Sequence, residues 1–338
     1  MKLFDTAIYT STYIPLKKKL ITVGSNTIRS FEINNNLLLN SETIIGKLPN
    51  IFSIDVSQDG NNIAMKNTSG TIFVYSLKEK KFLWKRKENE TALNDVYFLP
   101  DGKRLLSADE YGTLFLLDVQ SKKVQTIKRI DGTGFGKIVR VSSAVFLWIE
   151  KLTCEESPLE TNLYLIYADS DSIKIEFWDK SFSMDVPLII NVEQNKKLFY
   201  SNGFDIWCYD IFTRTANCIL SDQQYKNYIL DKMKKKNDQI DPEILSIVQD
   251  VMQDFNLGDA QMDVTPFDNF AIIDSDHLVL LFSDSIVVFS KNKNEIIFSF
   301  EKSDAFFNSV AKIESEDIYL FGGWEHSVSF SKKELITQ

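Results

Sequence analysis

The two histidines of this chain, His277 and His326, are its only side chains with an ordinary pKa near neutrality, and they lie far apart in the sequence. A hydrolase or lyase generally needs several histidine or carboxylate side chains that converge on one site. The chain also lacks a glycine-rich phosphate loop, a serine elbow and a nucleotide-binding fingerprint. We therefore expect a non-catalytic protein with no cofactor and no metal ion.

Two other groups of residues could do chemistry, and for each we favour a structural interpretation. The Asp-Ser-Asp runs at 169–171 and 274–276 could bind calcium if further oxygen ligands converged, but such runs more often form hairpin turns. The three cysteines, Cys154, Cys208 and Cys218, have no zinc-binding spacing, and their odd number excludes a small disulfide scaffold. Cys208 and Cys218 flank a predicted hairpin and could face each other, but we expect reduced, mostly buried thiols.

The charge balance excludes some classes of partner. The chain has 38 Lys and Arg against 47 Asp and Glu, a net charge of −9. An acidic surface repels nucleic acids and attracts a basic protein, and we interpret the basic runs 17–19, 85–87 and 234–236 as solvated turns or helix ends. Neither a signal peptide nor an 18-residue apolar window is present, so we expect a cytoplasmic protein that binds no membrane.

An internal repeat indicates the fold. Residues 53–77 and 95–119 each contain an Asp-Gly pair, at Asp59 and Asp101, and a Gly-Thr pair eleven residues later. An Asp-Gly pair between alternating apolar runs is a strong hairpin signal, so each segment predicts a small antiparallel meander. The two copies are 42 residues apart, which is the size of one four-stranded blade of a β-propeller.

The third strand of each unit carries a large, mostly aromatic residue that traces the repeat through the chain. The series predicts seven four-stranded antiparallel blades, in which these side chains fill the space between neighbouring blades. We assign the Trp178-Asp179 pair to the outer strand of the fourth unit, because too few residues separate it from Tyr209 for another blade. The residues of the series are Phe31, Tyr75, Leu117, Tyr167, Tyr209, Phe289 and Phe330.

At this level of detail the sequence resembles the WD-repeat propellers. The segments 56–60, 98–102 and 70–75 look like the family's Phe-Ser-Pro-Asp-Gly and Gly-Thr motifs, and the resemblance covers residues 49–132. The Gly-His pair of the family is absent, and Tyr-Ser, Leu-Asp or Tyr-Asp replaces its terminal Trp-Asp. The resemblance implies a rigid platform for protein partners, but no family site motif is present to carry over.

Two insertions interrupt the repeats within a single domain, residues 1–338. The first, Leu152–Thr161, is acidic, and the second, residues 222–263, separates the fifth and sixth blades. Asp241 as N-cap and Pro242 at the first helical position predict that the second insertion is a helical hairpin. In the WD-repeat arrangement, the loops that join strands two and three gather on the same face as the loops between blades. Both insertions are therefore expected on this loop-rich face.

We expect a monomer that acts as an interaction scaffold or adaptor and binds a protein partner through this face. Aromatic side chains in its turns are good interface anchors, and its acidic side chains would attract a basic partner. One alternative is an inhibitor or immunity-type protein that masks a basic toxin. Another is an enzyme or small-ligand binder with its site in the central channel. The candidate partner-binding residues are Tyr111, Glu155, Glu156, Glu160, Tyr225, Tyr228, Phe255 and Trp324.

Overall fold

The structure is a computed structural model, and it describes most of the repeat-forming part of the chain. The described residues are 2–4, 7–24, 26–34, 37–48, 50–87, 95–108, 113–128, 134–152, 160–168, 172–179, 190–192, 197–202, 205–221, 224, 268–282, 284–302 and 304–337.

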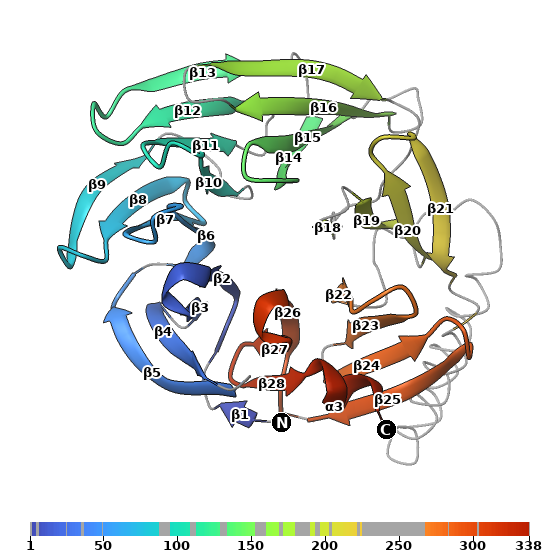
Figure 1. Ribbon diagram of the computed structural model, residues 1–338. Helices are drawn as coiled ribbons and strands as arrows, with labels where there is room; N and C mark the ends of the chain where they lie inside the picture. The colour runs from blue at the N-terminus through green and yellow to red at the C-terminus, as the bar shows by residue number, and fades with distance from the viewer. Residues whose placement is uncertain are drawn as a thin grey trace, which may run out of the picture.

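Seven antiparallel sheets of four strands form a ring around a central channel, as predicted (Figure 1). Strands are given from the inner to the outer edge of each blade. Blade 1 consists of β2 (Thr10–Ile14), β3 (Lys19–Gly24), β4 (Thr27–Asn34) and β5 (Leu37–Ile45). Blade 2 consists of β6 (Ile51–Val56), β7 (Asn62–Asn67), β8 (Thr71–Ser76) and β9 (Lys81–Lys87), and blade 3 of β10 (Val96–Phe98), β11 (Arg104–Ala108), β12 (Leu114–Asp118) and β13 (Val124–Lys128).

The next three blades repeat the same order. Blade 4 consists of β14 (Gly134–Arg140), β15 (Val145–Leu152), β16 (Glu160–Ala168) and β17 (Ile173–Asp179). Blade 5 consists of β18 (Ile190–Val192), β19 (Lys197–Asn202), β20 (Asp205–Asp210) and β21 (Thr215–Leu220). Blade 6 consists of β22 (Asn269–Ile272), β23 (His277–Phe282), β24 (Ser285–Ser290) and β25 (Glu295–Glu301).

Blade 7 closes the ring with strands from both ends of the chain. Its inner three strands are β26 (Phe307–Ile313), β27 (Ile318–Gly323) and β28 (Ser327–Ser331), and its outer strand is β1 (Lys2–Phe4). β1 pairs antiparallel with β28, so the first described residues join the sheet formed by the last ones (Figure 1). These hydrogen bonds hold β1 in blade 7, and the chain then continues from β1 into β2 of blade 1, which closes the ring.

The described residues contain little helix. One α-helix, α3 (Lys332–Ile336), follows β28, and the 3₁₀ turns η1 (Pro15–Lys17) and η2 (Glu314–Glu316) each join the first two strands of a blade. Ser331 caps α3 and forms a capping box with Glu334. The predicted helical hairpin at 222–263 lies, apart from Gln224, outside the described residues and stays a prediction.

The Asp-Gly turns form as predicted between the first and second strands of blades 2 and 3. Gly60 and Gly102 take the positive φ angles of +67° and +65° that such turns need. The Asp59 carboxylate accepts a hydrogen bond from the Asn61 backbone nitrogen at 3.0 Å. Asp101 accepts one from the Lys103 nitrogen at 2.8 Å. Each turn is therefore stabilised by hydrogen bonds to the aspartate side chain and by the positive φ angle of the glycine.

The core consists of seven apolar clusters, and each lies between two neighbouring blades. Every blade therefore has two buried faces, which explains why the repeat is stable only as a closed ring. Six residues of the third-strand series pack against the preceding blade and are at most 6% exposed, as predicted. They are Phe31, Tyr75, Leu117, Tyr209, Phe289 and Phe330.

The seventh residue of the series, Tyr167, lies between two blades as predicted, but it is one residue out of register with the other six. It is half-buried and packs in the cluster shared with blade 5, whereas the fully buried Ile166 packs against blade 3. A shift of one residue reverses the face of a strand. Apolar side chains occupy both faces of Asn162–Ala168, so alternation could not distinguish the two registers.

The Trp178-Asp179 pair lies at the end of the outer strand β17, as predicted, and it contacts the next blade. The indole nitrogen of Trp178 donates to the Ile211 carbonyl at 2.8 Å, and the guanidinium of Arg214 lies 4.4 Å from the ring centroid. The Tyr209 hydroxyl donates to Asp179 at 2.6 Å. The pair thus connects blade 4 to blade 5 at the rim.

Candidate functional site

Connections of two kinds share one face of the ring, which we call the loop face. Because successive strands are antiparallel, the loops between second and third strands lie at the same end as the connections between blades. Both long insertions are at this end, one between β15 and β16 and the other between β21 and β22, as predicted. Their tips, residues 153–159 and 225–267, lie outside the described residues.

Most of the candidate residues from the sequence therefore remain predictions. Glu160 is the first residue of β16, and only its backbone is described. Trp324 lies in the loop between β27 and β28, and its side chain is 59% exposed. The others lie outside the described residues: Tyr111, Glu155, Glu156, Tyr225, Tyr228 and Phe255.

Trp324 and Phe306 are exposed aromatic side chains on the loop face, and a backbone hydrogen bond between Ile8 and Gly323 brings the exposed Tyr9 to the same region. We call Tyr9, Phe306 and Trp324 the aromatic patch. The rings of Phe306 and Trp324 are stacked, with centroids 4.8 Å apart and planes at 33°. Tyr9 comes from the connection between β1 and β2, and Phe306 from the connection between β25 and β26. Sequence reasoning missed both Tyr9 and Phe306.

Two glycines allow the three segments of the patch to meet. The Ile8 nitrogen donates to the Gly323 carbonyl at 2.9 Å. A β-carbon on Gly323 would lie 2.1 Å from the Phe306 carbonyl oxygen, and one on Gly322 would lie 2.3 Å from that of Ile8. Only glycine permits such close backbone approach, so the Gly-Gly-Trp sequence determines how the patch is assembled.

Two acidic side chains, Asp304 and Asp268, also lie in connections on the loop face. The Asp304 carboxylate accepts a hydrogen bond from Lys302 at 2.6 Å, and it lies 3.2 Å from a ring nitrogen of His326. The hydrogen bond from Lys302 lowers the pKa of the Asp304 carboxyl. Burial away from water and the negative charge of Asp284 raise the pKa of Asp268, the residue immediately before β22. Among the described residues, the loop face therefore presents both aromatic rings and carboxylates.

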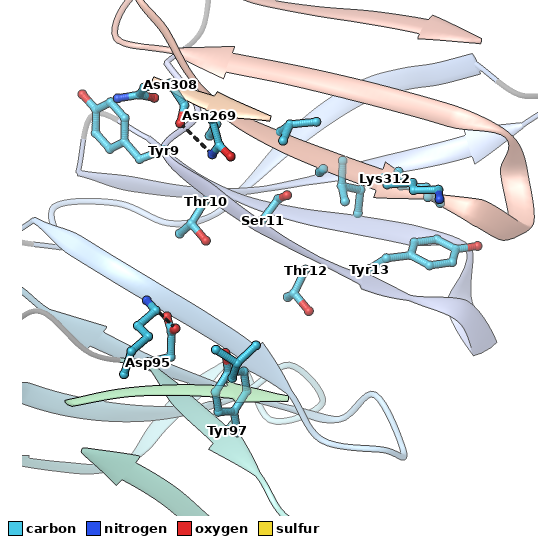
Figure 2. A pocket seen from close by; sticks show the side chains of 17 residues that line it. Tyr9, Thr10, Ser11, Thr12, Tyr13, Asp95, Tyr97, Asn269, Asn308 and Lys312 are labelled. Atoms are coloured by element: carbon cyan, nitrogen blue, oxygen red, sulfur yellow. Dashed lines mark hydrogen bonds and ion pairs between the residues drawn. The ribbon is translucent and has the colours of Figure 1, made fainter. Parts of the chain in front are cut away.

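The central channel contains a cavity of about 510 Å³ with a mainly polar lining (Figure 2). Threonine, serine, tyrosine and asparagine side chains from the inner strands β2, β10, β22 and β26 face it. Asn269 donates to the Asn308 carbonyl at 3.1 Å, beside Tyr9 of the aromatic patch (Figure 2). Asp95, the one carboxylate among the described lining residues, forms an ion pair with Lys137 at 2.9 Å.

The described lining residues include few side chains that could act as an acid or a base. No histidine is among the described lining residues, and the Asp95 carboxylate is held by a cation. In the part of the chain that the structure describes, no three His, Cys, Asp or Glu side chains are grouped as metal ligands.

The remaining candidates have structural roles on the opposite face and the rim. His277 lies 2.9 Å from Asp274 and 3.3 Å from Asp276, and the Asp-Ser-Asp run forms the turn before β23, as we favoured. The second run, 169–171, lies outside the described residues. Cys208 and Cys218 are not joined by a disulfide, and β20–β21 pairing places Cys218 opposite Trp207. Cys218 is exposed, so the prediction of mostly buried thiols was wrong for it.

Comparison with known proteins supports the same architecture. No family model matches the chain. A curated protein of Acanthamoeba polyphaga mimivirus, described as a putative BTB/POZ domain and WD-repeat protein, is 26% identical over 196 residues. The match covers 55% of this chain and 36% of the relative, so the chain matches about a third of that protein's length. Within the described residues no helix is long and apolar enough to span a bilayer.

Proposed function

Because this chain is a WD-repeat-like seven-bladed propeller, we propose that it is a non-catalytic interaction scaffold that binds a protein partner through its loop face. The observation that carries the proposal is the stacked pair Phe306–Trp324, which is solvent-exposed although three backbone segments are packed to position it. Exposed aromatic rings on a rigid base make good interface anchors, because they bury a large area at little entropic cost.

The predicted helical hairpin at 222–263 would lie beside the same surface and form one side of the partner groove. The insertion ends next to β22, and Asn269 at the start of this strand contacts Asn308 beside Tyr9. The acidic loop between β15 and β16 would contribute from the same face. We propose a single domain, a monomer in the cytoplasm, and a partner with a basic surface that complements Asp268, Asp304 and the net charge of −9.

The test is affinity purification from the native cells with quantitative mass spectrometry, using the wild type and single alanine variants. Trp324→Ala and Phe306→Ala should each lose most of the specific partner. Phe212→Ala is the matched control, because Phe212 is 61% exposed but lies on the opposite face, between β20 and β21. Equal capture by Trp324→Ala and by a variant lacking 223–263 would refute the loop face as the binding surface.

Salt dependence tests the charge of the partner separately. Attraction between an acidic face and a basic partner weakens as salt shortens the screening length from about 10 Å at 0.1 M to about 3 Å at 1 M. The dissociation constant of the purified complex should therefore rise over this range, mainly through slower association. A dissociation constant independent of salt would exclude a basic partner, and with it the inhibitor of a basic toxin.

A further inference from the structure

The outer strand of blade 2, β9, has an edge that no other described strand covers. It pairs with β8 on its inner side and is the last strand of its sheet. Figure 1 shows it on the outer circumference of the ring. An edge strand presents a row of backbone N–H and C=O groups to which another extended chain can pair.

The charge of this edge is opposite to that of the protein as a whole. Residues 78–87 contain six Lys or Arg and one acid, Glu79, which is paired with Lys81 at 2.7 Å. Within β9 itself there are four cations, whereas no other outer strand of the seven blades has more than one. An edge can be protected from aggregation by a single lysine, so four exceed what protection requires.

A groove beside this edge is also basic. It has a volume of about 440 Å³ and is lined by Phe82, Leu83, Trp84, Lys85, Arg86 and Lys122. The Arg86 guanidinium donates to the Lys122 carbonyl at 3.0 Å, which holds the β12–β13 turn of blade 3 against the end of β9. The side chains of Lys85, Arg86 and Lys122 are all exposed.

Of the two aromatic side chains in the groove, Trp84 is buried and is not available to stack on bases. Trp84 is only 5% exposed, and the Phe82 ring, 45% exposed, packs edge-on against Tyr75 with centroids 5.2 Å apart. Nucleic-acid binding by stacking needs free aromatic faces. A peptide matches the edge better, because it alone can pair with the backbone groups of β9 while its acidic side chains meet the cations.

We propose that an acidic, extended segment of a partner protein adds to β9 as a fifth strand of blade 2. This site is on the rim, separate from the aromatic patch, and does not depend on the loop-face proposal. The protein would then present two surfaces of opposite charge, one for a basic partner and one for an acidic segment.

Fluorescence anisotropy with the purified full chain tests the proposal. The probe is a labelled peptide of alternating glutamate and threonine, about twelve residues long, which is enough for one strand. A peptide of alternating glutamate and proline has the same charge but lacks half of the backbone N–H groups. The first peptide should bind at least about tenfold more tightly than the second, and equal binding would overturn strand addition.

Protein variants locate the site. Lys85→Glu/Arg86→Glu should weaken binding of the glutamate–threonine peptide at least about tenfold, through like-charge repulsion. The control Lys293→Glu/Lys333→Glu makes the same charge change on exposed residues of blade 6 and α3 and should leave binding within about twofold. Equal weakening by both variants would refute a site at β9, and Trp324→Ala should have no effect on this peptide.

Other occupants are measured in the same assay. An oligothymidylate or phosphatidylserine vesicles that bind more tightly than the glutamate–threonine peptide would replace the proposal with a polyanion surface. A dimer detected by light scattering that Lys85→Glu/Arg86→Glu abolishes would make the occupant a second copy of this chain. Circular dichroism and thermal melts of each variant confirm that the fold is retained.

Discussion

Asp55 and Arg140 form a two-pronged ion pair that joins blade 2 to blade 4 across the inner strand of blade 3. The two guanidinium nitrogens lie 2.9 and 2.7 Å from the two carboxylate oxygens. Phe98, on the inner strand β10 of blade 3, hydrogen-bonds to both members of this ion pair. Its backbone nitrogen donates to Asp55 at 2.6 Å, and Arg140 donates to its carbonyl at 2.9 Å. Three inner strands are therefore held together by one pair of charged side chains.

Removal of the carboxylate should destabilise the ring. Asp55 is 4% exposed, so Asp55→Ala leaves the Arg140 guanidinium and the Phe98 nitrogen without their partner. We expect a loss of about 2–3 kcal/mol in the free energy of unfolding, measured by urea titration. Glu79→Ala, which breaks an exposed pair with Lys81, is the control and should leave the free energy of unfolding nearly unchanged. Similar losses in both variants would contradict a structural role for the buried pair.

Gly323→Ala should disrupt the aromatic patch. Its β-carbon would lie 2.1 Å from the Phe306 carbonyl, so the backbone of one segment must move. We expect a destabilisation of about 2–4 kcal/mol and increased quenching of Trp324 fluorescence by acrylamide. Gly46→Ala is the matched control, since a β-carbon there meets nothing within 4 Å. If Gly323→Ala melts at the wild-type temperature, the patch does not depend on this contact.

The register of blade 4 can be tested with two alanine variants. Ile166 is fully buried between blades 3 and 4, so Ile166→Ala should cost about 2–4 kcal/mol. Tyr167 is half-buried on the other face, and Tyr167→Ala should cost less than half as much. The two free energies, measured by chemical unfolding, would be reversed if Tyr167 occupied the position first predicted.

Alkaline pH should destabilise the protein through Tyr164. Burial and a hydrogen bond to Glu150, 3.0 Å long, raise the pKa of this phenol from 10.0 to about 12. A raised pKa stabilises the fold below pH 10, and the contribution is lost as pH increases from 10 through 12. The free energy of unfolding should therefore fall over this range, less steeply in Tyr164→Phe. Identical slopes in the variant and the wild type would contradict the assignment.

Acid should weaken the attachment of α3 to blade 6. Although partial burial opposes ionisation, hydrogen bonds from Lys332 and His277 hold the pKa of Asp274 well below its usual value of 3.8. A lowered pKa stabilises the fold above pH 3.8, and this contribution disappears as pH falls below that value. The wild type should be more stable than Asp274→Asn by at most about 1 kcal/mol at neutral pH, and the difference should vanish in acid. Chemical unfolding at a series of pH values measures this difference.

Local patterns were sufficient to predict the blades. The Asp-Gly turns at Asp59 and Asp101 depend on residues that are neighbours in the sequence, so the sequence predicts them directly. The large third-strand side chains are buried between blades, and their regular spacing along the chain reveals this burial. The same reasoning failed at Tyr167, because two buried faces remove the alternation that identifies the register. It also failed at Cys218, which is exposed on the outer strand β21, where burial does not follow from residue type.

The sequence by itself determined seven four-stranded repeats, the positions of their insertions and an acidic net charge, because each depends on spacing or composition. Only the tertiary structure decided that β1 closes the ring with β28 and that Tyr9, Phe306 and Trp324 form one patch. It also decided that Arg86 and Lys122 share one groove. These relationships join residues from different blades, and their proximity depends on ring closure, which no local pattern in the chain encodes.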